Sequence, residues 1–259
     1  MNRNKPTQPT TLYLQGGPGL NCAVERHLLG EAFPVRWWEP PRFPSETNDA
    51  YQRTLDAAAQ TLLALQESNG EPIAIAAWSF GARLALDLAH RMSEAIKSLT
   101  LLAPTVCLES AFARFYAHLN GDYSLDAKGT SASLAGDHDR LMLLVMAILT
   151  TPNVFEHYWA KTSHDQFAQH SSAVAQTDWF DLPTFTAVSR EVIQRPIIPL
   201  VSSHRLPIHI WLGKNDPYRD PSGDISAWNM IFPGATIQIE DCGHMVPFEI
   251  PVARWLGPD

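Results

Sequence analysis

The sequence has few cysteines. Only three of its 259 residues are cysteine, and Cys22, Cys107 and Cys242 stand far apart, in a spacing that matches no metal-binding or redox motif. The number is odd, and scattered thiols of this kind are most simply explained as buried or free cysteines in a reducing compartment. We therefore expect a cytoplasmic protein, and the cysteines predict no metal site.

Positive charge is also scarce. The chain has 19 Lys and Arg against 27 Asp and Glu, which gives a formal net charge of −8, and no basic stripe occurs along it. Nucleic acids and anionic membranes attract proteins that present clustered Lys and Arg. The composition therefore argues against either of them as the main partner.

Long hydrophobic runs are absent as well. The polar N-terminus, MNRNKPTQPT, has no apolar region of the kind found in a secretory signal. The longest apolar run, Leu141–Leu149, is too short to span a bilayer. Because 45% of the residues are hydrophobic, the chain can still supply a sizeable core. We expect a folded domain without membrane insertion that acts on a small molecule.

Short apolar runs alternate with helical patterns near both ends of the sequence. This alternation favours an α/β fold with a mostly parallel sheet of about six strands and helices on both faces. The expected strands are residues 10–15, 35–38, 73–77, 98–103, 208–212 and 235–240. The clearest helices outside the middle of the chain are residues 21–30, 49–68, 82–92 and 225–232.

The middle of the chain shows helical periodicity and no convincing strand. We therefore predict a core of residues 1–108 and 201–259 and a helical cap of residues 109–200 over the carboxyl edge of the sheet, where α/β proteins bind ligands. The expected cap helices are residues 111–119, 135–149, 155–161, 164–176 and 184–193. Aromatic residues of the cap either form its own core or line an apolar pocket. Its acidic residues either meet a cationic substrate or face solvent.

The stretch Pro72–Met92 predicts a strand that turns directly into a helix, with Ser79 at the corner. A Gly-x-Ser-x-Gly nucleophile elbow has this context, because its sharp turn holds the serine oxygen above the sheet edge. Here Ala77 replaces the first glycine and Gly81 keeps the second. Both positions must be small, so the substitution weakens the match only slightly. An ordinary strand-to-helix turn that happens to contain serine is the alternative interpretation.

A nucleophilic serine needs a base and a group that orients the base. His244 is the best of the ten histidines because it follows the last strand by a few residues, next to a glycine that lets the loop bend. Asp216 follows the strand before it and is the best candidate for the orienting acid. The alternative role for Asp216 is that of a turn residue before Pro217.

An oxyanion hole needs two backbone donors near the nucleophile. One is the amide of the residue after the serine, Phe80. The other comes from the loop after an early strand, where the sequence reads Gln15-Gly-Gly-Pro-Gly19. Because glycine lets a backbone approach its ligand closely, Gly17 is the predicted second donor.

The order Ser79, Asp216, His244 is that of the α/β-hydrolases, and the sequence resembles this superfamily over nearly its whole length. Its QGGPG loop resembles the HGGPG loop of the proline iminopeptidase-like branch, and GHMVPFEIP resembles the catalytic-histidine segment of the family. The resemblance implies an α/β-hydrolase fold with a helical cap and a serine hydrolase that uses no metal and no cofactor.

The sequence departs from the family pattern in ways that affect the expected activity. Gln15 replaces the usual histidine, and only about ten residues precede the first strand, so we expect the first two family strands to be absent. Phe155–Ala160 does not reproduce the tryptophan and glutamate with which proline iminopeptidases bind the substrate amine. We therefore expect hydrolysis of an ester of a small, largely apolar molecule ahead of aminopeptidase activity. A lyase, a cofactor-independent oxygenase or a binding protein on the same fold is the third alternative.

Overall fold

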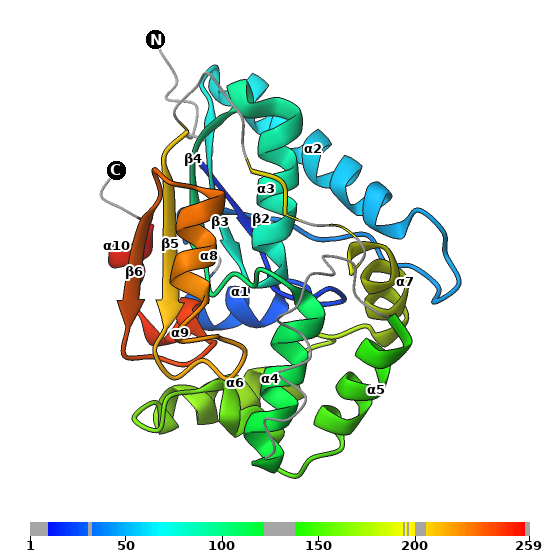
Figure 1. Cartoon of the computed structure of the whole chain (residues 1–259). Coiled ribbons are helices and arrows are strands. Elements are labelled where there is room, and N and C mark those ends of the chain that lie inside the picture. Colours follow the sequence, from blue (N-terminus) through cyan, green and yellow to red (C-terminus); the bar gives the residue numbers. More distant parts are fainter. Residues whose placement is uncertain are drawn as a thin grey trace.

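A computed structural model describes residues 10–30, 33–121, 138–193, 195, 197–199 and 206–256 of the protein. Its centre is a six-stranded sheet in the order β2-β1-β3-β4-β5-β6 (Figure 1). All neighbouring strands run parallel, which confirms the predicted fold class. The strands are β1 (Thr11–Leu14), β2 (Arg36–Trp37), β3 (Ile73–Trp78), β4 (Ile96–Leu102), β5 (Ile208–Gly213) and β6 (Thr236–Glu240).

The strand β3 lies in the middle of the sheet and is buried on both faces. Successive side chains of a strand point to opposite faces. Ile73, Ile75 and Ala77 therefore join the larger hydrophobic core on one side, whereas Ala76 and Trp78 join a second core on the other. This explains why the sequence of β3 is apolar throughout instead of alternating with polar residues.

Helices cover both faces of the sheet. The larger core packs beneath α2 (Ala50–Asn69), α3 (Phe80–Met92) and α8 (Asp224–Ile231). The second core packs beneath α1 (Ala23–Leu29), α9 (Val246–Glu249) and α10 (Val252–Trp255).

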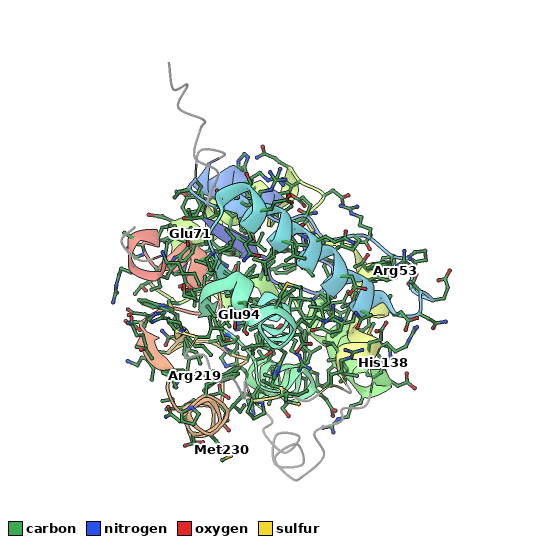
Figure 2. The ribbon with its side chains drawn as sticks, turned by 90° about the horizontal axis from the view of Figure 1, so that it is seen from above. Arg53, Glu71, Glu94, His138, Arg219 and Met230 are labelled. Atoms are coloured by element: carbon green, nitrogen blue, oxygen red, sulfur yellow. The ribbon has the colours of Figure 1, made fainter. Side chains whose placement is uncertain are left out.

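Charged residues lie on the outer surface of the α2 and α3 layer. Arg53 on α2, Glu71 after it and Glu94 beyond α3 are exposed and project outward (Figure 2). The apolar side chains of these helices point the other way, toward the sheet, where they form part of the larger core.

Among the described residues, four α-helices and a 3₁₀ helix, which we call the cap helices, lie between β4 and β5. They are α4 (Leu108–Asn120), α5 (His138–Leu149), η3 (Val154–Tyr158), α6 (His164–Ala175) and α7 (Leu182–Val192). Figure 1 shows α4, α5 and α6 beyond the arrowheads of the strands, at the carboxyl edge of the sheet. The last helix differs from the others, because its residues Ala187, Val188 and Val192 pack into the larger core with α2.

Most predicted elements lie where the sequence places them, and the main difference is in the cap helices. The predicted helix over residues 155–161 is a short 3₁₀ helix, η3, and Trp159 after it is extended. The reason is tertiary, because the Ala160 amide donates a hydrogen bond to Glu249 instead of continuing a helix. Residues 135–137 of another predicted helix lie outside the described residues. Among the described helices, none combines the length and the apolar character needed to cross a bilayer.

Candidate active site

Ser79 occupies a strained turn between β3 and α3. Its backbone has φ +51° and ψ −115°, a conformation that residues other than glycine rarely adopt. The Ser79 amide donates a hydrogen bond of 2.8 Å to the Leu102 carbonyl on β4, which fixes the turn to the sheet. A Cβ at Gly81 would collide with the Leu14 carbonyl oxygen, so the close approach of α3 to β1 requires glycine there.

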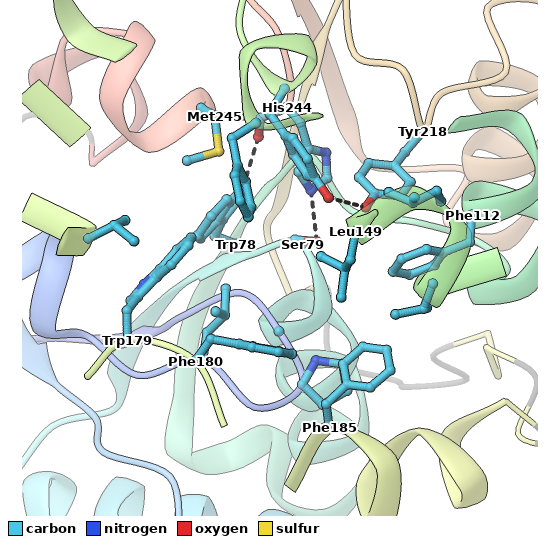
Figure 3. Close-up of a pocket in the computed structure, with 18 of the residues that line it drawn as sticks. Trp78, Ser79, Phe112, Leu149, Trp179, Phe180, Phe185, Tyr218, His244 and Met245 are labelled. Carbon is cyan, nitrogen blue, oxygen red and sulfur yellow. Dashed lines mark hydrogen bonds between the residues drawn. The ribbon is translucent and has the colours of Figure 1, made fainter. Parts of the chain in front are cut away.

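The structure brings the predicted serine, acid and histidine together, and Figure 3 shows the contact between Ser79 and His244. The distance from His244 Nε2 to Ser79 Oγ is 2.9 Å, and that from His244 Nδ1 to Asp216 Oδ2 is 2.8 Å. The three residues follow β3, β5 and β6, whose carboxyl ends meet at one edge of the sheet. The side chains of His244 and Asp216 are both buried, so their direct contact is shielded from solvent.

Backbone and side-chain contacts hold in place the loop of residues 241–245 between β6 and α9, which carries His244 and which we call the histidine loop. The His244 amide donates to the Tyr158 carbonyl at 2.7 Å, and Trp78 Nε1 donates to the His244 carbonyl at 3.0 Å. Asp216 is held too, because its second carboxylate oxygen accepts a hydrogen bond from the Tyr218 amide at 2.9 Å. The imidazole therefore sits in a frame built from β3, the loop after β5 and the cap helices.

Glu249 links the cap helices to the histidine loop, a role that the sequence did not reveal. Its carboxylate accepts hydrogen bonds from the Gly243 amide at 2.8 Å, the Ala160 amide at 2.9 Å and the Ser163 hydroxyl at 2.7 Å. Burial raises the pKa of Glu249, although these three donors favour the ionised form. The only signal in the sequence is a carboxylate shortly after Pro247 in the histidine segment.

The two predicted oxyanion donors lie on the elbow and on the glycine loop. Phe80 is the first residue of α3, so its amide has no acceptor within the helix. Gly17 has φ +121° and lines the same cavity as Ser79. Gln15, which replaces the family histidine, donates from Nε2 to the Leu20 carbonyl at 3.2 Å and so closes the glycine loop across its base.

Ser79 opens into a cavity of about 300 Å³ between the sheet edge and the cap helices. Its wall is mainly apolar and carries many aromatic rings (Figure 3). The aromatic rings of the wall belong to Trp78, Phe112, Phe155, Tyr158, Trp159, Trp179, Phe180, Phe185 and Tyr218. These side chains come from both the sheet and the cap helices, so some cap aromatics do line a pocket, whereas others, such as Phe115, pack inside the cap.

The cavity offers little charge to a ligand. No Lys or Arg is among the described residues that line it, and its one carboxylate, Asp178, forms an ion pair with Arg42 at 2.6 Å. Burial lowers the pKa of the lining histidine His170 to about 4, so that this imidazole is neutral at physiological pH. His170 is packed among the rings of Trp159, Trp179 and Phe248.

Metal-binding arrangements are missing from the part of the chain that the structure describes. No group of three or more His, Cys, Asp or Glu side chains there is placed to hold a metal ion. The three cysteines are free, and Cys22 and Cys242 are buried.

Comparison with a family model supports the resemblance seen in the sequence. The model, described as alpha/beta hydrolase fold, matches residues 30–251. No curated protein sequence is similar enough to match this chain.

Solved structures share the fold at low sequence identity. A proline iminopeptidase-related protein from Thermus thermophilus is 21% identical with a TM-score of 0.66, and the alignment covers 94% of this chain and 86% of that one. A thermophilic esterase from Thermogutta terrifontis is 15% identical with a TM-score of 0.59, and the alignment covers 95% of this chain and 88% of that one. An epoxide hydrolase from Bacillus megaterium is 12% identical with a TM-score of 0.52, and the alignment covers 93% of this chain and 88% of that one. At these identities the likeness shows the fold alone.

Proposed function

Because this chain belongs to the α/β-hydrolase fold family, we propose that it is a serine hydrolase that cleaves an ester of a small, uncharged and largely apolar molecule. One observation carries the proposal, namely the continuous line of hydrogen bonds from Asp216 through His244 to Ser79. A serine with this pair of partners is arranged for nucleophilic catalysis. The three free cysteines fit a reducing compartment, and we place the protein in the cytoplasm.

Ser79 Oγ attacks the ester carbonyl carbon while His244 Nε2 takes the hydroxyl proton. Asp216 holds the Nδ1–H tautomer of the imidazole and stabilises its cationic form. The tetrahedral intermediate then breaks its bond to the alkoxide, which leaves as the alcohol after it receives the proton from His244. Water attacks the acyl-enzyme with His244 again as base, and the carboxylic acid and the free serine are released.

Negative charge develops on the carbonyl oxygen during both attacks. In our proposal the amides of Gly17 and Phe80 stabilise this charge. A donor of this kind lowers the barrier by about 3 kcal/mol. The proposal draws support from the place of Phe80 at the first turn of α3, where the positive end of the helix dipole also favours an oxyanion.

The wall of the cavity supports an uncharged substrate. An anionic substrate would lose its hydration without meeting a cation, because the described lining residues include no Lys or Arg. An N-terminal amine would need a carboxylate, and the one in the lining, Asp178, is already paired with Arg42. This ion pair adds to the missing tryptophan and glutamate of the proline iminopeptidases as a reason to rank ester hydrolysis ahead of aminopeptidase activity.

A panel of substrates tests the proposed function. Acyl esters of graded chain length and aminoacyl amides, prolyl amide included, are assayed with the unmodified enzyme and with Ser79→Ala. We expect ester turnover that falls at least about 10³-fold in Ser79→Ala. Ser68→Ala, which changes an exposed serine on α2, is the matched control and should leave turnover unchanged.

Two results would redirect the assignment. Turnover of prolyl amide that stops when its amine is acylated would favour the aminopeptidase. No turnover of any ester or amide would favour a lyase or a binding protein on this fold.

A further inference from the structure

Two tyrosine hydroxyls meet in the wall of the cavity beside the histidine. The hydroxyl oxygens of Tyr158, from η3, and Tyr218, in the loop after β5, are 2.8 Å apart. Both residues line the cavity that contains Ser79. The Tyr218 ring centroid lies 4.7 Å from that of His244, and Figure 3 shows the Tyr218 hydroxyl directed toward the centre of the site.

The two hydroxyls have one more proton than the hydrogen bond between them needs. Burial raises the pKa of Tyr158 to about 12 and raises that of Tyr218 well above its ordinary value, so both phenols stay protonated. Two phenols carry two hydroxyl protons, and the bond between them uses one. Among the described residues, neither hydroxyl has a hydrogen-bond partner other than its neighbour. One hydroxyl proton therefore remains to be donated within a largely apolar cavity.

The two rings are held so firmly that the hydroxyls cannot easily turn away. The Phe115 ring packs edge-on against Tyr158, with centroids 4.8 Å apart, and at a tilt against Tyr218, with centroids 5.0 Å apart. The Phe112 ring centroid lies 5.1 Å from that of Tyr218. Their backbones are fixed as well, since the Tyr158 carbonyl accepts from His244 and the Tyr218 amide donates to Asp216. A donor held in this way is preorganised for a ligand.

We propose that the Tyr158 and Tyr218 hydroxyl pair donates one hydrogen bond to a neutral acceptor on the substrate, a carbonyl, ether or hydroxyl oxygen next to the scissile ester. The substrate class is then an oxygenated apolar ester rather than a plain hydrocarbon ester. This inference rests on the proposed function only in that the substrate occupies the cavity beside Ser79. The hydroxyl pair is thus a specificity device, because a ligand without an acceptor leaves the donor unpaired.

Binding of two ligands that differ by one oxygen tests the proposal without turnover. The ligands are 1-phenylbutan-1-one and n-butylbenzene, and their dissociation constants are measured by calorimetry and by quenching of the cavity tryptophans. All measurements use the full chain carrying Ser79→Ala. With both tyrosines present we expect the ketone to bind roughly 3- to 10-fold more tightly than the hydrocarbon, as one neutral hydrogen bond gives.

Phenylalanine variants then locate the donor. Tyr158→Phe and Tyr218→Phe each leave one hydroxyl with its own proton, so each should keep a preference for the ketone. The double variant has no donor and should bind the two ligands equally. Loss of the preference in one single variant would also support the proposal and would identify that tyrosine as the donor. Tyr116→Phe, on α4 and outside the cavity lining, is the control and should change nothing.

The ratio of the two affinities decides the outcome, because a general change of the cavity affects both ligands alike. Equal affinities with both tyrosines in place would overturn the proposal. A ketone preference that persists in the double variant would overturn it too, since the ketone would then be bound by other donors such as Gly17 and Phe80. Neither result depends on whether the substrate panel supports an esterase.

Discussion

At the scale of single residues, Trp78 precedes the proposed nucleophile, Ser79, and also holds the proposed base, His244. Its indole nitrogen donates to the His244 carbonyl, and its ring packs against Gly16 at the start of the glycine loop. One side chain therefore contacts the loop that carries His244 and the glycine loop, while its backbone leads into Ser79. We infer that Trp78 is a positioning residue for the proposed reaction.

Trp78→Phe keeps an aromatic ring but removes the indole donor. We expect kcat for the best ester to fall about 5- to 10-fold, with a smaller change in KM, because the loss of one hydrogen bond loosens His244. Trp228→Phe, on α8 and buried in the larger core, is the control for a general loss of packing. An unchanged kcat, or a fall in kcat that Trp228→Phe reproduces, would contradict the positioning role.

Glu25 makes the stability of the protein depend on pH. This carboxyl on α1 is fully buried, and burial raises its pKa to about 8, an effect that the nearby Trp179 indole and Arg26 only partly offset. The native state therefore binds one proton more than the unfolded state between about pH 4.5 and pH 8. The contribution of Glu25 to stability is fully present below this window and is lost as the pH rises through it.

Glu25→Gln should remove this dependence. The free energy of unfolding of the unmodified protein, relative to that of the variant, should fall by on the order of 4 kcal/mol as the pH rises from 4.5 to 8. Urea denaturation of both proteins at several pH values measures the difference. A difference that stays constant or rises with pH would show that Glu25 is ionised in the native state.

At the scale of elements, the close packing of α3 against the end of β1 depends on glycine at position 81. A Cβ at Gly81 would collide with the carbonyl oxygens of Leu14 and Gln15, which are backbone atoms and cannot move aside cheaply. Gly81→Ala should therefore lower the free energy of unfolding by about 2 to 4 kcal/mol or prevent folding.

Gly234→Ala is the matched control for this change. A Cβ at Gly234 meets nothing within 4 Å, so we expect a change within about 0.5 kcal/mol. Thermal and urea unfolding of both variants provide the comparison. Equal stabilities of the two variants would contradict the close approach of α3 to β1.

Glu249 joins two elements that are far apart in the sequence. Glu249→Ala removes the acceptor of three hydrogen bonds and leaves the buried amides of Gly243 and Ala160 without a partner. We expect the free energy of unfolding to fall by about 2 to 3 kcal/mol and ester turnover to fall with it, because the histidine loop loses its tie to the cap helices. Circular dichroism during urea unfolding and the ester assay measure the two effects.

The exposed Glu71 provides the control for this change. Glu71→Ala removes a carboxylate without a role in the loop and should leave stability and turnover within error. Full activity of Glu249→Ala would contradict the link between the cap helices and the site.

These elements also show what the sequence could predict. The turn at Ser79 was predictable because a buried strand, a small-residue corner and a helical pattern follow each other directly. The end of the 3₁₀ helix η3 could not be predicted from the sequence. It depends on the contact of Tyr158 with His244 and on that of Ala160 with Glu249, and each contact joins residues more than eighty positions apart. Local periodicity carries no information about such contacts.

At the scale of the whole molecule, six parallel strands bring the ends of β3, β5 and β6 to one edge, and the cap helices place aromatic side chains over that edge. The order of strands made the meeting of Ser79, Asp216 and His244 predictable, because each residue follows a strand of one parallel sheet. The wall of the cavity was not predictable. Its residues come from several cap helices whose packing angles do not follow from their sequences.

The most direct test of the account is the site of covalent labelling by a fluorophosphonate. Intact-protein mass spectrometry should show one added phosphonyl group, and peptide mapping should place it on Ser79. Ser79→Ala should take up none, and His244→Ala should react roughly 10²- to 10⁴-fold more slowly, because the general base is lost. No adduct on the unmodified protein, or an adduct on another residue, would contradict the claim that Ser79 is the nucleophile.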